Sequence, residues 1–133
     1  MSISTKTKTK AKAKAKDKQK ILLVDDEIDI TLSLKLFLEE NGFEVDTYNN
    51  PSLAIANYKP GLYNLLILDI KMPQLDGFEL YERIHKLDKN ANVFFLTAVS
   101  DFSSYKGDKS LLRENHFIQK PIDGPELLKR IAE

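Results

Sequence analysis

Four short apolar runs in this sequence each lead into a polar side chain, and together these side chains could carry out phosphoryl chemistry. In chain order they are the acid pair Asp25 and Asp26, the acid Asp69, the hydroxyl of Thr97 and the amine of Lys120. Carboxylates with no histidine or thiol among them form an oxygen site that suits Mg²⁺, which completes its coordination shell with waters and phosphate oxygens. A lysine and a hydroxyl can donate to a phosphoryl group, and a carboxylate beside the metal can accept that group as a nucleophile.

The apolar runs themselves predict the strands that position these residues. Leu65–Leu68 is too apolar for a half-exposed strand and too short for a buried helix, so it predicts a parallel strand covered on both faces. Ile21–Val24, Asn92–Ala98 and His116–Pro121 predict three further strands, the last one short. In open α/β sheets ligands bind at the edge where the carboxyl ends of the strands meet. We therefore expect the polar residues to converge at that edge.

The first acid pair also stands directly before a helix. Apolar spacing predicts this helix from about Glu27 to Asn41, and Gly42 is a suitable stop after it. A purely structural interpretation of Asp25 and Asp26 is that one of them caps this helix.

The remaining segments complete an alternation of strands and helices. Phe43–Tyr48 alternates with period two and predicts a half-exposed edge strand, and Asn50 opens a short helix that ends near Pro60. Asp76, in a capping box with Glu79, is expected to be structural and to open a third helix. The last helix starts with Asp123, Pro125 and Glu126, and the third has an inward stripe of Phe78, Tyr81, Ile84 and Leu87. Five strands alternating with helices predict a parallel sheet with helices on both faces.

Composition limits the class of protein. The 133 residues, 42% of them apolar and 30% charged, suffice for one ordinary domain. The sequence has no cysteine, which favours a reducing compartment, and we expect the cytoplasm. Apolar runs are far shorter than the ~20 residues that span a bilayer, and the N-terminus lacks a secretory apolar core, so no membrane span is expected.

The charges divide the chain into a basic tail and an acidic remainder. Residues 1–20 hold eight lysines and one acid, a net charge of +7, while the other residues hold 12 basic and 19 acidic side chains, a net charge of −7. The tail, residues 1–19, has alternating lysines and no large apolar partner, so we expect it to be disordered. It is either a solvated extension or a weak contact for polyanions, namely nucleic acid or anionic lipid.

From residue 20 to residue 133 the sequence resembles the response-regulator receiver domain of two-component, or phosphorelay, signalling. The resemblance rests on the acid pair Asp25–Asp26, the run from Asp69 to Gly77, the pair Thr97–Ala98 and the pair Lys120–Pro121. It implies an α/β fold of three layers, a flavodoxin-like, doubly wound five-stranded parallel sheet with strand order 2-1-3-4-5. It also implies that the Lys120–Pro121 bond is cis.

The resemblance further implies the roles of the site residues. Asp69 would be the phosphoacceptor, with Thr97 and Lys120 as phosphoryl contacts, and Thr97 and Phe117 as the switch pair. Mg²⁺ would be held by Asp25 or Asp26, by Asp69 and by the backbone carbonyl of Lys71. The implied partners are a histidine kinase or phosphotransfer protein and an unknown downstream protein. Such a domain is not an enzyme beyond its own phosphorylation and dephosphorylation.

Two other interpretations and one departure from the family pattern complete the sequence analysis. A degenerate receiver could act as a constitutive binding module, although all the acidic, hydroxyl and lysine positions are intact. An aspartate-nucleophile phosphatase would need a second acid two residues after the nucleophile, where this chain has Lys71. Gly107 interrupts the segment that would form the fourth helix, so that helix is expected to be short or irregular. His85 and His116 are expected to be ordinary packing or surface residues, and no effector domain is expected after residue 133.

Overall fold

A computed structural model describes residues 18–97 and 116–133 of the chain. All but the last two residues of the predicted tail, and the predicted irregular fourth helix, lie outside the described residues. The five described strands form one sheet in the order β2-β1-β3-β4-β5, and every pairing is parallel. The strands are β1 (Lys20–Val24), β2 (Glu44–Tyr48), β3 (Leu65–Asp69), β4 (Asn92–Thr97) and β5 (Phe117–Gln119). This order confirms the predicted order 2-1-3-4-5.

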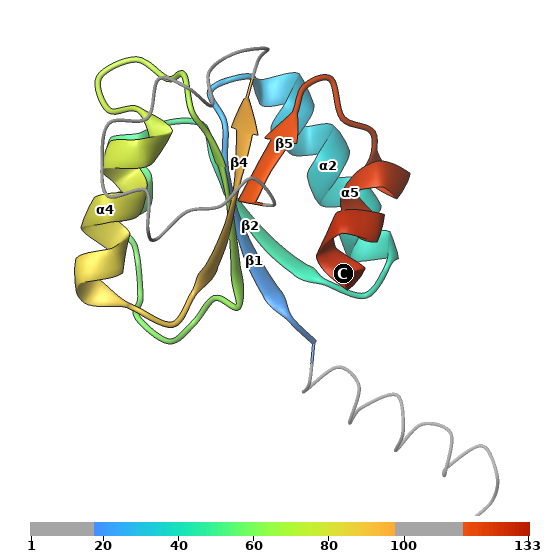
Figure 1. Cartoon of the computed structure of the whole chain (residues 1–133), viewed down its shortest axis with the longest axis horizontal. Coiled ribbons are helices and arrows are strands. Elements are labelled where there is room, and N and C mark those ends of the chain that lie inside the picture. The colour runs from blue at the N-terminus through green and yellow to red at the C-terminus, as the bar shows by residue number, and fades with distance from the viewer. Residues whose placement is uncertain (1–17, 98–115) are drawn as a thin grey trace, which may run out of the picture.

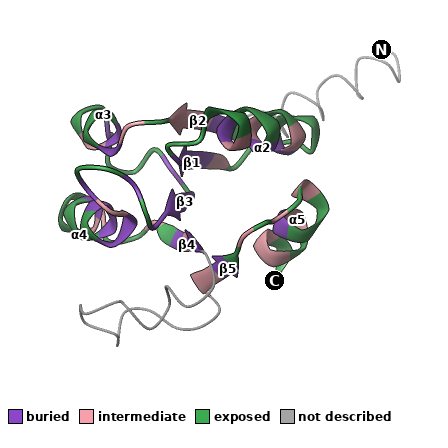
Figure 2. Ribbon diagram, turned by 90° about the horizontal axis from the view of Figure 1, so that it is seen from above, coloured by how far each residue is buried: buried purple, intermediate pink, exposed green. Residues whose placement is uncertain are grey.

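Helices cover both faces of the sheet. They are α2 (Ile28–Glu40), α3 (Pro51–Ala56), α4 (Gly77–Leu87) and α5 (Gly124–Ala132). Seen from above, α2 and α5 lie on one face of the sheet and α3 and α4 on the other (Figure 2). The arrowheads of β4 and β5 point toward the same edge of the sheet (Figure 1). The three-layer, doubly wound architecture is therefore the one that the sequence predicts.

Alternate residues of the inner strands supply two separate cores. In β1, Leu22 and Val24 belong to the core under α3 and α4, whereas Ile21 and Leu23 belong to the core under α2 and α5. All four side chains are fully buried. A strand buried on both faces has no polar face, because each of its side chains enters one core or the other. This explains the continuous apolar runs of the sequence.

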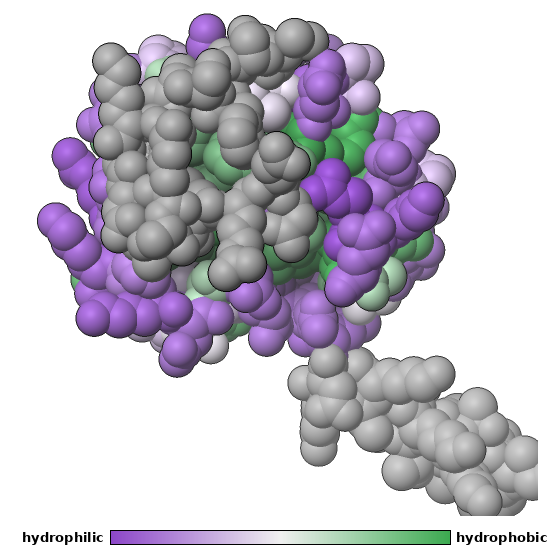
Figure 3. Space-filling model, in the orientation of Figure 1, coloured by the Kyte–Doolittle hydropathy of each residue, from purple (hydrophilic) through white to green (hydrophobic). Residues whose placement is uncertain are grey.

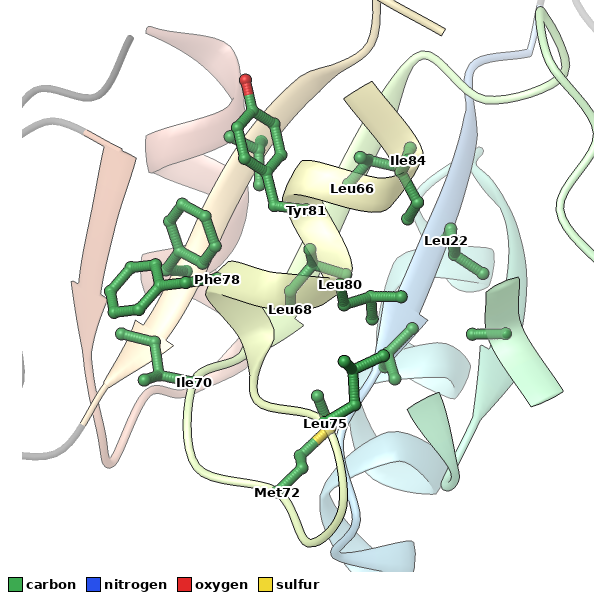
Figure 4. Packing of buried hydrophobic residues seen from close by; sticks show 14 of the residues in the cluster. Leu22, Leu66, Leu68, Ile70, Met72, Leu75, Phe78, Leu80, Tyr81 and Ile84 are labelled. Atoms are coloured by element: carbon green, nitrogen blue, oxygen red, sulfur yellow. The ribbon is translucent and has the colours of Figure 1, made fainter. Parts of the chain in front are cut away.

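The core under α4 continues into the loop that follows β3. Met72 and Leu75 are buried side chains of this loop, and Figure 4 shows them close to each other at the end of the cluster that α4 makes with the sheet. The loop backbone is also fixed, since the amide of Gly77 donates to the carbonyl of Ile70 at 2.8 Å. The backbone that follows Asp69 therefore has a fixed conformation.

Several predicted helix boundaries are confirmed and others are wrong. Gly42 has φ +94° directly after the C-cap of α2, as a left-handed stop requires, and Asp76 caps α4 by accepting from the amide of Glu79. The expectation that Asp25 or Asp26 caps α2 is wrong, because Glu27 occupies the N-cap position.

Two further differences arise at the ends of helices. The helix opened by Asn50 ends at Ala56 rather than near Pro60. Leu87, expected on the inward stripe of α4, is 54% exposed because the helix ends there and its last turn extends past the core. Phe78, Tyr81 and Ile84 are buried as predicted.

Gly77 leaves no room for a side chain beside the end of β3. A Cβ atom at this position would collide with the backbone carbonyl of Asp69. We expect Gly77→Ala to destabilise the fold by about 1–3 kcal/mol through overpacking, although alanine is the better helix former. The backbone amide shifts of Asp69 and Ile70 should change with it.

Gly61→Ala is the matched control, because a Cβ there meets nothing within 4 Å and only the φ of +81° is strained. This variant should lose stability without changing the amide shifts of Asp69 and Ile70. Equal changes of the Asp69 amide shift in the two variants would show that the contact with Gly77 does not position Asp69.

Candidate functional site at the carboxyl edge of the sheet

The strand register places the ends of four strands side by side. Val24 pairs with Leu68, and Asp69 pairs with Leu96, so Asp25 and Asp69 extend from adjacent strands. On the other side, the backbone amide of Lys120 donates to the carbonyl of Thr97 at 2.7 Å. The predicted site residues therefore come from β1, β3, β4 and β5 at one edge of the sheet.

Three of these residues form an acidic cluster. One carboxylate oxygen from each of Asp25, Asp26 and Asp69 lies within 4.8 Å of the other two. Asp25 is fully buried and Asp69 is 5% exposed, whereas Asp26 is exposed. Carboxylates this close repel one another, and burial strengthens the repulsion because little water screens it.

Backbone and side-chain hydrogen bonds fix Asp25 in this cluster. Its Oδ1 accepts from the amide of Glu27 at 2.9 Å, and its backbone carbonyl accepts from Nδ2 of Asn49 at 2.7 Å. The same Nδ2 donates to the hydroxyl of Thr31 at 2.9 Å and so joins the end of β1 to α2. Asn49 was not identified from the sequence, where it looks like one more polar residue before a helix cap.

Lys120 supplies positive charge to the cluster. Its Nζ lies 2.9 Å from Oδ2 of Asp25 and 3.3 Å from Oδ1 of Asp69. Burial alone would lower the pKa of Lys120, but the carboxylates of Asp25, Asp69 and Glu27 outweigh it and raise the pKa to about 12. Lys120 is therefore an ammonium at neutral pH.

The surroundings favour the charged form of Lys120 but disfavour the charged form of Asp69. Burial is the main cause that raises the pKa of Asp69, the charge of Asp25 adds to it, and Lys120 opposes both. The resulting pKa is about 7. A carboxyl group with this pKa is destabilised as an anion, so added positive charge should restore its ionisation.

Glu27 also belongs to the site, although sequence reasoning placed it only at the start of a helix. Its Oε1 accepts a hydrogen bond from Nζ of Lys120 at 3.3 Å. The signal that could have found it is its place at an N-cap, where serine, threonine, aspartate and asparagine are preferred.

The other predicted site residues lie around the acidic cluster. Thr97 ends β4 and is 6% exposed, while Lys71 is exposed on the loop after β3. The ring of Phe117 is partly buried and packs against the core under α4, with its centroid 5.5 Å from that of Phe95 and 6.1 Å from that of Phe78. The Lys120–Pro121 peptide bond is cis, as expected.

Neither His85 nor His116, which were expected to be ordinary packing or surface residues, belongs to the acidic cluster. His85 is on α4 and its ring lies 5.5 Å from that of Tyr81, whereas His116 directly precedes β5.

The acidic cluster fits a hard divalent cation such as Mg²⁺. Three carboxylates and no sulfur or imidazole offer the oxygen ligands that Mg²⁺ prefers. Among the described residues, Oδ2 of Asp25 is the buried side-chain oxygen that accepts no well-directed hydrogen bond, even though Lys120 lies 2.9 Å away. It therefore retains a lone pair that a cation could use.

The fold and this site together define a class of signalling domain. Residues 21–132 match the family described as Response regulator receiver domain, and the chain belongs to this family. Receiver domains are signalling domains of two-component systems and generally not enzymes.

Individual relatives are identical to this chain at somewhat more than one third of the aligned positions. The chemotaxis protein CheY of Treponema pallidum is 35% identical over 115 residues, which cover 84% of this chain and 78% of that protein. A CpxR homolog of Haemophilus influenzae, a transcriptional regulatory protein, is 38% identical over 111 residues, covering 83% of this chain and 47% of that protein. The chain thus spans about half the length of such regulators.

A solved receiver domain has the same architecture. The non-phosphorylated HemR receiver domain from Leptospira biflexa is 33% identical, with a TM-score of 0.71, covering 86% of this chain and 92% of that one. Within residues 18–97 and 116–133 of our chain, no helix is long and apolar enough to cross a membrane.

Neutralising Asp69 should stabilise the metal-free protein. Its pKa in the folded state lies above that of the unfolded chain, so the wild type loses stability as the pH rises from about 4 to about 7. Asp69→Asn cannot lose a proton at this position. Above pH 7 in EDTA we expect the variant to be more stable by about 1–3 kcal/mol, and near pH 4 the two proteins should converge.

Urea unfolding at pH 4, 6 and 8 measures this difference. A variant that is no more stable than the wild type at pH 8 would show that ionisation of Asp69 does not destabilise the fold.

Proposed function

We propose that this chain is a phosphoacceptor domain in which Asp69 takes a phosphoryl group from a histidine kinase or phosphotransfer protein in a Mg²⁺-dependent reaction. One observation carries the proposal: a buried carboxylate at the end of β3 lies in an acidic cluster and 3.3 Å from the Lys120 ammonium. A nucleophile, a cation site and a phosphoryl contact are thus adjacent.

The transfer requires an in-line displacement at phosphorus. An oxygen of the Asp69 carboxylate forms the new P–O bond, the P–N bond to the donor imidazole breaks, and the imidazole leaves with the electron pair and takes up a proton. Lys120 is close enough to the acceptor oxygen to neutralise charge on the phosphoryl group, and we assign the same purpose to the hydroxyl of Thr97. Asp69 must be ionised to attack.

Asp25, Asp26 and Asp69 are the side chains that would hold Mg²⁺, with the backbone carbonyl of Lys71 as a further ligand. When bound, the cation supplies positive charge to the phosphoryl oxygens. The protein contributes the crowded carboxylates, which repel one another until a cation is present.

The exposed face of α2 supports a protein as the phosphoryl donor. Ile28, Leu32 and Leu36 recur every four residues on this helix and are 66%, 55% and 55% exposed. They form one apolar stripe that begins next to Glu27 at the site. On the side of α2 and α5, hydrophobic surface interrupts the hydrophilic surface (Figure 3). We infer that a helix of the donor protein packs here and brings its phosphohistidine to Asp69.

The two alternatives are weaker. Burying the carboxylate of Asp69 beside an ammonium costs folding free energy. A degenerate receiver, which is not phosphorylated, would gain nothing from this cost. A phosphatase would need an acid two residues after Asp69 to protonate the leaving group, and that residue is the exposed Lys71.

A small phosphodonor tests the proposal without a known kinase. Acetyl phosphate with Mg²⁺ should phosphorylate the wild type at Asp69, and either EDTA or Asp69→Ala should abolish the modification. Intact-mass spectrometry gives the extent of modification, and reduction of the acyl phosphate with borohydride locates it.

Asp88→Ala is the control, because Asp88 is an acid whose partners, Tyr58 and Gly61, lie away from the acidic cluster. It should be modified like the wild type. Phosphate that persists in Asp69→Ala would place the acceptor elsewhere and contradict the proposal.

We further propose that phosphorylation is transmitted through Thr97 to Phe117. The Thr97 hydroxyl would move toward the phosphoryl group and leave space for the ring of Phe117, so phosphate biases an existing equilibrium. The ring already packs against Phe95 and Phe78, and phenylalanine has no hydroxyl that must stay hydrated. We therefore expect the inward orientation to be more populated before phosphorylation than it would be with tyrosine.

Thr97→Ala should accept phosphate on Asp69 and lose this response. Beryllofluoride, a phosphoryl mimic, should shift the ring signals of Phe117 in the wild type and leave them nearly unchanged in Thr97→Ala. Equal shifts in both proteins, measured by aromatic NMR, would show that Thr97 is not the link.

The Lys-rich tail, the cytoplasmic location and the downstream partner stay predictions of the sequence. For the tail, salt-sensitive retention on a polyanion that is lost on deletion of residues 1–19 would be counterion release.

A further inference from the structure

Glutamate is not among the residues preferred at the position that Glu27 occupies before α2. It is the N-cap of α2, and its side chain makes no cap hydrogen bond. Aspartate or serine there would satisfy an amide of the first turn. Instead, Oε1 accepts from Nζ of Lys120, 93 residues away along the chain, at 3.3 Å. Glu27 thus lacks the usual N-cap hydrogen bond and instead contacts Lys120, the lysine to which we assign a phosphoryl contact.

The contacts of Lys120 show why this matters. Oxygens of Asp25, Glu27 and Asp69 lie 2.9, 3.3 and 3.3 Å from its Nζ, and the contact with Glu27 is a hydrogen bond. A phosphoryl oxygen that approaches Nζ must compete with these carboxylates for the ammonium.

Glu27 is the acceptor that is easiest to displace. The side chain of Asp25 is fully buried, and its second oxygen is fixed by the amide of Glu27. Asp69 itself carries the phosphoryl group. The side chain of Glu27 is 61% exposed, so water can solvate its carboxylate once Lys120 leaves.

We propose that Glu27 is a positioning residue that holds Lys120 in the resting protein and competes with the phosphoryl group for it. This inference rests on the proposed function and adds a regulation of the same site. Glu27 sets how strongly the resting state resists phosphorylation, because Lys120 exchanges one anion for another when the phosphoryl group arrives. The negative charge of Glu27 at the site also opposes an incoming phosphoryl group.

Two substitutions at Glu27 separate its contact from its charge. Glu27→Gln removes the charge. Glu27→Asp keeps the charge, shortens the side chain by one methylene so that it withdraws from Lys120, and provides a better N-cap. Asp29→Asn is the matched control: Asp29 lies in the first turn of α2, and it is not an ion-pair partner of Lys120 in the part of the chain that the structure describes.

The experiment is a titration with beryllofluoride at saturating MgCl2, followed by amide NMR. We expect Glu27→Gln and Glu27→Asp to bind about two- to fivefold more tightly than the wild type, as the loss of one exposed ion pair allows. Asp29→Asn should bind like the wild type. Glu27→Asp should melt no lower than the wild type, which excludes general loosening of α2.

A second readout is independent of phosphoryl binding. In the metal-free protein, the ¹⁵Nζ chemical shift of Lys120 should change in both Glu27 variants and stay constant in Asp29→Asn.

The outcomes distinguish the two proposals. A wild type that does not bind beryllofluoride contradicts the phosphoacceptor function and this inference with it. A wild type that binds, with Glu27→Asp unchanged in affinity and in the Lys120 signal, overturns this inference alone. Equal gains in Glu27→Gln and Asp29→Asn would also overturn it, because overall charge would then be the cause.

Discussion

The ion pairs of one ammonium group hold the functional edge of this domain together. Nζ of Lys120 lies within 3.3 Å of carboxylates that come from the end of β1, the start of α2 and the end of β3. Two of these carboxylates, Asp25 and Asp69, are buried and would repel each other without it. The strand before Lys120, β5, is only three residues long, so this lysine also helps to attach the last strand.

The backbone around Asp69 is shaped so that its carboxylate can reach this ammonium. Gly77 packs against the Asp69 carbonyl, and its own amide closes the loop by donating to Ile70. Within the loop, Gln74 has a φ of +73°, which is unfavourable for a residue other than glycine. Buried Met72 and Leu75 flank this residue and stabilise the turn through contacts in the core. Packing under α4 thus contributes to holding the site in position.

Much of the fold could be predicted from the sequence, because each feature had a local physical cause. Apolar runs gave the inner strands, and Gly42 gave the end of α2. The meeting of distant polar residues at one edge followed from the expected sheet, but particular side-chain contacts within that edge could not be predicted in this way. Glu27 looked like an ordinary first residue of a helix, and its contact with Lys120 depends on how α2 and β5 pack on the same sheet. Asn49 gave no signal because its partners, Asp25 and Thr31, are 24 and 18 residues away.

Opposing charge effects in the same site support the switching role that we propose for this edge of the sheet. Burial and Asp25 raise the pKa of Asp69 to about 7, and the surrounding acids raise that of Lys120 to about 12. The acids exceed the single nearby ammonium in charge, so the resting arrangement is under electrostatic strain. A bound cation would relieve that strain. Because the charged groups sit at the ends of β1, β3 and β5 and on the residue before α2, any change that relieves the strain acts on several elements at once.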